Sequence, residues 1–406
     1  MSREVVVTGV GAVTPLGESF AATWSALIAG RDAQAPLDLF DTSGCRCRTA
    51  ASCALPALPD LPAKALRRLA RPSRLALPAA REALAAAGLL DGDLRSRQRE
   101  LPIVVSSTAG GMRLAEDFAR RVLAGKRAHL FSQISRYLPQ QQVLDLQQAL
   151  GVRGHSVVVA NACASGANAV GHAADLIAAG AAECVLAGGF EALTELVFVG
   201  FDSLQAATTD RCRPFDIKRS GLMIGEAAAF LVLESPAHAR ARGAAPLAHL
   251  TGYAHSTDVF HLTQPEPSGA VLAEVMRAAA RDAGVVPEEI GYINAHGTAT
   301  PANDGVEALA YRAFLGDAVG DARISSTKAA IGHTLGAAGA IEALFALGSL
   351  RTGEIPPQLN LQSPIPEIAA ALAGPDESAP EMRHVMSVNL GFGGSNAALI
   401  FSRADA

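Results

Sequence analysis

One cysteine stands where its thiol could act as a nucleophile. Cys163 follows the apolar run 157–160 and precedes the small residues 164–166 and an alanine-rich stretch, a pattern that predicts strand, tight turn and helix. A thiol at a helix N-terminus meets free backbone N–H groups and the positive end of the helix dipole, which favour the thiolate. This arrangement resembles a nucleophile elbow. The alternative is a buried structural cysteine, the common fate of a free thiol.

Three further turns after predicted strands carry side chains that could take part in such chemistry. In open α/β sheets, ligands bind at the carboxyl ends of the strands, so these turns could meet at one edge. The alternatives are a core histidine, a surface lysine and a plain hairpin turn. Together with Cys163, the two imidazoles and one amine predict thiol chemistry at that edge. The turns are 294–301 with His296, 325–333 with Lys328 and His333, and the glycine-rich 391–396.

The elements that must position these turns alternate between strands and helices, which predicts an α/β fold. The pattern of the first part returns in the second, and we predict a duplicated unit divided into residues 1–254 and 255–406. A proline at position 72 is expected to interrupt one helix, and the glycines 188–189 to form a turn. Strands are predicted at 5–8, 101–107, 157–160, 184–187, 227–234, 247–253, 291–295, 323–326, 385–390 and 397–401, and helices at 18–29, 63–87, 140–150, 269–283 and 336–350.

Composition excludes several classes of protein. The chain has 406 residues, of which 50% are hydrophobic, enough for a large core. A net charge of −5 argues against nonspecific nucleic-acid binding. The most apolar segment, 335–350, carries Glu342 and predicts a buried helix, and no signal peptide is expected, so we predict a cytoplasmic protein without membrane contact. The cysteines 45, 47 and 53 lack zinc-site spacing, and no metal is expected.

The reactive turns resemble those of the β-ketoacyl-acyl carrier protein synthases, the decarboxylating condensing enzymes of fatty-acid and polyketide synthesis. The resemblance runs nearly from end to end and is closest to the elongating class with a Cys-His-His set, because the initiating class would carry Asn at position 333. It implies a thiolase fold of five layers, α-β-α-β-α, built from two duplicated halves, usually as a homodimer. The matching segments are 162–166, 296–300, 326–328 with 332–333, and 391–394.

The resemblance also implies a role for each residue of the set. Cys163 would accept the acyl group, while His296 and His333 would donate N–H groups to the enolate formed by decarboxylation. The acyl oxygen would bind the backbone N–H groups of Cys163 and Phe392. Lys328 would orient the His333 region with Glu342 as its partner. Other implied positions are Phe392 and Phe201 as gates, Thr298 and Thr300 at the pantetheine arm, Gly391 and Gly393 in the substrate-binding turn, and Ala109 in the acyl channel.

Carrier protein is acidic, so a basic docking rim is expected. Arg67, Arg68 and Arg71 are predicted on one helical face, with Lys126 and Arg127 in a second cluster; the alternative is a solvated basic face. The phosphopantetheine would arrive on the carrier, and no metal or redox cofactor is implied.

Two other classes of protein compete with the ketosynthase interpretation. A non-catalytic chain-length-factor homologue would typically lack the nucleophile, and a degradative thiolase would carry a second cysteine within 385–396. Neither fits. We expect the partner subunit to be an identical chain. The alternative is a heterodimer in which the partner is a chain-length-factor homologue.

Overall fold

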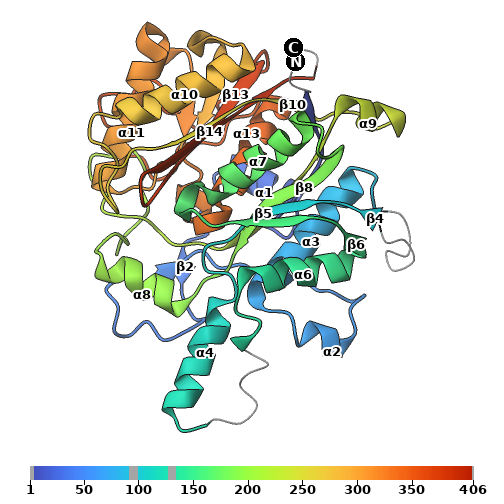
Figure 1. Cartoon of the computed structure of the whole chain (residues 1–406). Coiled ribbons are helices and arrows are strands. Elements are labelled where there is room, and N and C mark those ends of the chain that lie inside the picture. Colours follow the sequence, from blue (N-terminus) through green and yellow to red (C-terminus); the bar gives the residue numbers. More distant parts are fainter. Residues whose placement is uncertain (1–3, 91–98, 127–133, 405–406) are drawn as a thin grey trace.

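Ten strands form one continuous sheet in the computed structural model, which describes residues 4–90, 99–126 and 134–404 (Figure 1). Their spatial order is β12-β11-β13-β14-β10-β1-β9-β8-β5-β7. The first half of the chain supplies β1 (Val5–Val13), β5 (Ile103–Ser106), β7 (Ser156–Val159), β8 (Cys184–Glu191) and β9 (Ala227–Glu234). The second supplies β10 (Ala248–Thr257), β11 (Ile290–Asn294), β12 (Arg323–Ser325), β13 (His384–Gly391) and β14 (Ser395–Ser402).

The two sets of five strands have the same topology. Counted along the chain, each set has the spatial order first, fifth, fourth, second, third, and the two first strands, β1 and β10, pair antiparallel at the centre. In both sets the second and third strands are parallel, and the fourth and fifth antiparallel. This topology agrees with the predicted duplication. A boundary after residue 254 would divide β10, so we propose that the halves meet between Glu234 and Ala248.

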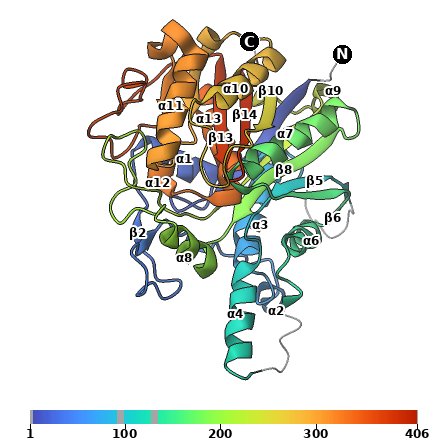
Figure 2. The same cartoon turned by 60° about the vertical axis from the view of Figure 1, so that its left-hand side comes forward.

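Helices cover both faces of each half and give the five predicted layers (Figures 1 and 2). The central helices are α7 (Ser165–Ala178) and α13 (Ala338–Thr352). The outer helices are α3 (Arg71–Ala86) and α6 (Pro139–Leu150) on the first half, and α10 (Ala270–Ala283) and α11 (Pro301–Leu315) on the second. Strand side chains alternate between these layers. In β9, Leu231 faces the central core and Phe230 the outer core; in β14, Leu399 and Ile400 divide in the same way.

The central helices approach each other closely because glycine stands at their contact. A side chain at Gly339 would collide with the backbone nitrogen of Ala167, and one at Gly166 with that of Ala340. Residues 338–350 of α13 are all buried, which confirms the predicted buried helix. No described helix is both long and apolar enough to cross a membrane. Glu342 of α13 is therefore buried and needs a partner inside the protein.

Two predictions of local structure are wrong. The helix expected at 63–87 is two helices, α2 (Ala63–Leu66) and α3, and Pro72 lies in the first turn of α3, where its missing N–H costs nothing. Gly188 and Gly189 continue β8 rather than turning, and glycine is needed there because side chains would collide with Ala229 and Ser106.

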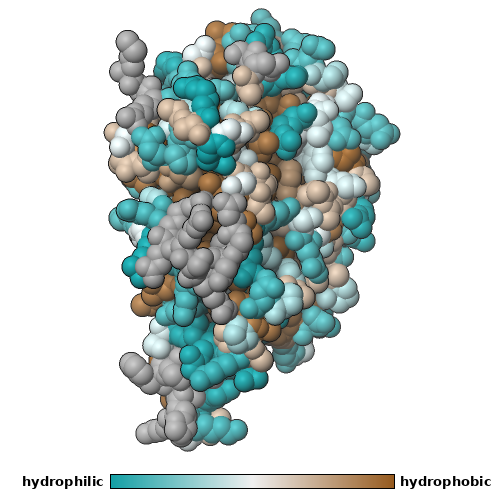
Figure 3. Space-filling view, turned by 90° about the vertical axis from the view of Figure 1, so that its right-hand side faces the viewer, coloured by the Kyte–Doolittle hydropathy of each residue, from teal (hydrophilic) through white to brown (hydrophobic). Residues whose placement is uncertain are grey.

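The remaining elements complete the surface. The helix α4 (Met112–Leu123) projects away from the body of the molecule in Figure 1. Hydrophilic residues predominate on this lower projection in Figure 3. The α-helices and strands not yet given are α1 (Phe20–Ile28), β2 (Ala35–Pro36), β3 (Thr49–Ala50), β4 (Arg99–Glu100), β6 (Val152–Arg153), α8 (Glu195–Ser203), α9 (Pro236–Ala241) and α12 (Lys328–Ile331).

Candidate active site

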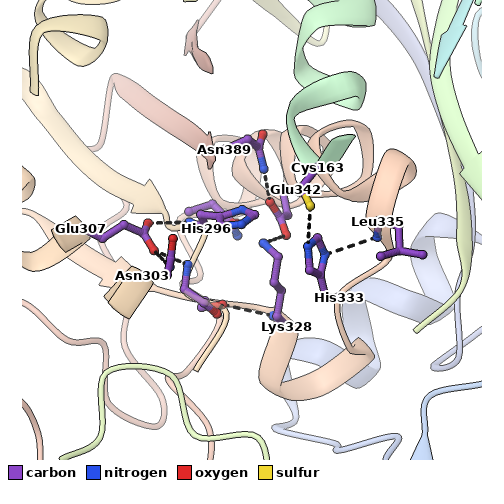
Figure 4. Close-up of polar contacts among 12 residues, drawn as sticks. Cys163, His296, Asn303, Glu307, Lys328, His333, Leu335, Glu342 and Asn389 are labelled. Atoms are coloured by element: carbon purple, nitrogen blue, oxygen red, sulfur yellow. Dashed lines mark hydrogen bonds and ion pairs between the residues drawn. The ribbon is translucent and has the colours of Figure 1, made fainter. Parts of the chain in front are cut away.

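The duplicated topology brings the reactive turns of both halves together. Cys163 follows β7, the third strand of the first half, while Lys328 and His333 follow β12, the third strand of the second half. His296 follows the neighbouring β11, and the glycine-rich turn joins β13 to β14. Figure 4 shows Cys163, His296, Lys328 and His333 close to one another, and the glycine-rich turn lines a cavity beside Cys163 through Gly391 and Phe392. The structure thus unites Cys163, His296, Lys328 and His333 as the sequence predicted.

The turn that presents Cys163 is tightly bent. Ala162 has φ +58°, a left-handed value that residues with side chains adopt rarely, as expected for a nucleophile elbow. The hydroxyl of Ser165 secures the bend, because it accepts from the backbone N–H of Asn161 (2.8 Å) and donates to the carbonyl of Ala162 (2.5 Å). A single 3-10 turn over Ala162–Ala164 then leads into α7. The predicted strand, turn and helix are confirmed.

The thiol of Cys163 is buried, and burial dominates its ionisation. Desolvation raises the pKa of Cys163 to about 11, against the lowering effects of the Lys328 cation and the backbone N–H of Phe392. The expectation that the helix N-terminus favours the thiolate is therefore wrong in its net direction.

The protonation of His333 is fixed by its surroundings. The backbone N–H of Leu335 donates to Nδ1 (3.3 Å), so the proton of the neutral ring is on Nε2, which lies 3.0 Å from Sγ of Cys163. Burial, and then the Lys328 cation, lower the pKa of His333 well below 6.5. His333 is therefore a neutral imidazole whose Nε2–H points at the sulfur.

His296 forms the second imidazole of the site, with its ring centroid 5.3 Å from that of His333 and the planes at 89°. Burial lowers its pKa well below 6.5, assisted by Lys328 and His333. Its backbone N–H donates to Glu307 (2.9 Å), which also accepts from Gly297 (2.6 Å). Both imidazoles line the cavity beside Cys163.

Glu307, on α11, is a residue that the sequence reasoning missed. It accepts from the amide of Asn303 (2.6 Å) and the hydroxyl of Tyr311 (2.6 Å) besides the His296 turn. Burial raises the pKa of Glu307 to about 7. Its spacing of eleven residues from His296 is the sole signal in the sequence, and it points to a carboxylate on the next helix.

Lys328 and Glu342 form a buried ion pair, which confirms the predicted partnership. The side chains are 1% and 2% exposed. The amide of Asn389, which was also missed, donates to the second oxygen of Glu342 (2.6 Å). The cation thus lies among the thiol and both imidazoles, and it lowers the pKa of all three groups.

A cavity of about 300 Å³ leads to Cys163 and His296. Thr298 and Thr300 line it with hydroxyl oxygens 2.9 Å apart. Phe201 and Phe392 also line it, with ring centroids 5.7 Å apart. Gly391 is part of the lining, whereas Gly393 and Ala109 are not. Whether Ala109 lines an acyl channel stays a prediction.

The basic residues predicted for docking do not share one face. Arg67 and Arg68 are exposed beyond α2, whereas Arg71 begins α3 and pairs with the buried Glu226, so the predicted common face is wrong. Lys126 is exposed after α4. Arg127 lies outside the described residues.

Comparisons with known proteins give one consistent result. Family models for the Beta-ketoacyl synthase N-terminal and C-terminal domains match residues 2–239 and 247–362. The 3-oxoacyl-(acyl-carrier-protein) synthase 2 of Staphylococcus aureus is 33% identical over 414 residues, covering 100% of this chain and 99% of that protein. The ishigamide ketosynthase/chain length factor is 32% identical with TM-score 0.91, covering 99% and 100%. A type II PKS acyl-carrier protein in complex with its ketosynthase is 25% identical with TM-score 0.87, covering 100% of each chain.

The buried cation generates the first prediction. Lys328→Met should raise the pKa of the Cys163 thiol, so the pH dependence of its alkylation by iodoacetamide should move to higher pH than in the wild type. The rate of adduct formation, followed by intact-mass spectrometry, measures this shift. Lys218→Met, at an exposed lysine, is the matched control and should leave the profile unchanged.

Lys328→Met leaves Glu342 as an unpaired buried carboxylate, and a second variant controls for the effect of that charge. In Lys328→Met/Glu342→Gln both charges are gone, and the profile should still move upward, because the effect of Lys328 on the thiol pKa exceeds that of Glu342. A profile at or below the wild-type position in both variants would contradict the role of the cation.

Proposed function

The chain belongs to the β-ketoacyl synthase family, and from this premise we propose that Cys163, His296 and His333 are its catalytic residues. The chain is an acyltransferase that extends a fatty-acid or polyketide chain by two carbons through decarboxylative Claisen condensation. The observation that carries the proposal is the Nε2–H of His333 at 3.0 Å from the Cys163 sulfur, in a tautomer fixed by Leu335.

In the first half-reaction, Sγ of Cys163 attacks the carbonyl carbon of an acyl thioester. A carbon–sulfur bond to Cys163 forms, the bond to the pantetheine sulfur breaks, and the thiol proton leaves with the released thiol. We propose that the carbonyl oxygen binds the backbone N–H groups of Cys163 and Phe392. Glycine at position 391 supports this role, because a side chain there would come within 3.1 Å of the Cys163 nitrogen and obstruct it.

In the second half-reaction, the malonyl thioester loses CO2, and the electrons of the broken carbon–carbon bond form an enolate. The enolate carbon attacks the acyl-Cys163 carbonyl, a new carbon–carbon bond forms, and the sulfur leaves as a thiolate that regains its proton from solvent. We propose that His296 and His333 donate to the enolate oxygen. Neutral imidazoles suit this task, because they stabilise the oxyanion without protonating it, and Lys328 helps to keep them neutral.

The cavity that leads to Cys163 suits the thioester arm of the substrate. We propose that Thr298 and Thr300 bind the pantetheine and that Phe392, 36% exposed, gates the sulfur together with Phe201. Gly393 has φ +82° and lies off the cavity, so its proposed role is to allow the turn to bend. No metal or redox cofactor is proposed, because protein N–H groups supply each donor that these steps require.

Acyl carrier protein is the proposed partner, and phosphopantetheine the group that it delivers. We propose that this chain forms a homodimer through the edge strand β7, whose backbone is unpaired on one side within the described chain. The complete Cys-His-His set supports the catalytic role in any heterodimer with a chain-length-factor homologue. Sedimentation of the purified chain as a monomer would contradict the homodimer.

Six free cysteines support a reducing, cytoplasmic location, which fractionation of the producing cells can test.

The division of labour among the three residues gives the second prediction. Cys163→Ala should gain no acyl adduct from acyl-carrier protein, whereas His296→Ala and His333→Ala should still be acylated. Each histidine variant should lose condensation by about 10²- to 10³-fold, because each lacks one enolate donor. Intact-mass spectrometry reports acylation, and release of labelled CO2 with product formation reports condensation. Wild-type condensation in either histidine variant would contradict the paired role.

Docking gives the third prediction. Reversing the charges of Arg67, Arg68 and Lys126 together should raise the KM for carrier protein about tenfold at low salt, with kcat nearly unchanged, because their proposed contribution is attraction to an acidic partner. The same reversal at the exposed Arg240, Arg312 and Arg351 is the control and should have little effect. Equal KM values for the two triple variants would contradict a docking role for Arg67, Arg68 and Lys126.

A further inference from the structure

The backbone group that fixes His333 is itself held in an unfavourable conformation. Leu335, whose N–H donates to Nδ1 of His333, has φ +51°. Residues with side chains populate this left-handed region sparsely, and such a conformation persists only where the surroundings impose it. Figure 4 shows the Leu335 nitrogen beside the ring that it orients. The surroundings that hold Leu335 therefore decide which nitrogen of His333 carries the proton.

The next residue, Gly336, is held at both ends of its backbone by the other half of the molecule. Its N–H donates to a carboxylate oxygen of Glu191 (3.0 Å), and its carbonyl accepts from the hydroxyl of Ser106 (2.7 Å). Both side chains are fully buried. They stand at the ends of adjacent parallel strands, Glu191 in β8 and Ser106 in β5. The approach requires glycine, because a side chain at Gly336 would come within 2.7 Å of the Glu191 oxygen.

All the donors to the Glu191 carboxylate among the described residues are backbone N–H groups or hydroxyl groups. Besides Gly336, its donors are the hydroxyl of Ser107 (3.0 Å), the N–H (2.8 Å) and hydroxyl (2.5 Å) of Thr108, and the N–H of Ala109 (3.0 Å). None of these donors is a basic side chain. The buried Glu226, by contrast, is paired with Arg71. Burying a carboxylate without a cationic partner costs free energy. We therefore expect Glu191 to have a role beyond filling space in the core.

We infer that Glu191 and Ser106 are positioning residues that hold Leu335 and Gly336 so that His333 keeps its Nε2–H tautomer. The same carboxylate ties the turn after β5, which contains Ala109, to the catalytic histidine. The two halves of the fold thus meet at a hydrogen-bond clamp one residue from the group that orients His333. This inference rests on the proposed function only for its effect on rate; the tautomer itself is a property of the protein without substrate.

The test compares Glu191→Ala and Ser106→Ala with the control Glu82→Gln. Glu82 also accepts backbone N–H groups, those of Ala12 and Phe20, but stands outside the cavity and the catalytic set. Nitrogen NMR of protein labelled at histidine reports the tautomer, and the His333 signals are identified by their loss in His333→Ala. Both alanine variants should show a mixture of tautomers, a kcat for condensation lower by about 10- to 100-fold and a nearly unchanged KM. The control should resemble the wild type.

A single Nε2–H tautomer in both alanine variants would overturn the inference. If Glu191→Ala does not fold, as judged by its thermal transition, Ser106→Ala decides the question by the same criterion, because it removes only one hydroxyl. A mixture of tautomers with unchanged kcat would uphold the clamp and contradict the proposed role of His333 as an enolate donor. The two ideas are therefore separable.

Discussion

The buried ion pair between Lys328 and Glu342 is the interaction on which the rest of the site depends. Removing both charges from water is costly, and the structure offsets that cost with a direct contact and a further hydrogen bond from Asn389. The Lys328 cation is thereby fixed among the Cys163 thiol and the two imidazoles. Burial alone would make the thiol a weak acid and the imidazoles weak bases. The cation lowers the pKa of the thiol, and it adds to the effect of burial, which lowers the pKa of both histidines.

The duplicated fold places α13 and α7 in contact at its centre, and this contact brings the ion pair to the turn that carries Cys163. Glycine at positions 166 and 339 permits the approach, and the contact brings Glu342 beneath the elbow of Cys163. The third strands of the two halves deliver the nucleophile and the Lys328–His333 turn to equivalent positions, so the topology of one unit, used twice, assembles the site. The hydrogen bonds of Glu191 and Ser106 to Gly336 then secure the junction of the halves at the histidine.

The residues of the candidate site could be predicted from the sequence, because each follows a strand within a turn of small residues. The family resemblance also implied the Lys328–Glu342 pair, and the structure shows it as a buried ion pair. Glu191 could not be, because its bond to Gly336 spans 145 residues and shows no periodicity. The ionisation of Cys163 was mispredicted because a helix-terminus argument is local, whereas desolvation depends on the whole fold. Arg71 was misassigned because its partner, Glu226, becomes its neighbour only on folding.

We propose that two neutral imidazoles, kept neutral by burial and by Lys328, donate hydrogen bonds to the enolate. The most direct test is a pH titration of the wild-type protein labelled with ¹⁵N at histidine, with the signals of His296 and His333 identified by their loss in single variants. We expect both rings to stay neutral through the ordinary histidine pKa of 6.5, as far down as the fold survives. Formation of an imidazolium at either residue near pH 6.5 would contradict it.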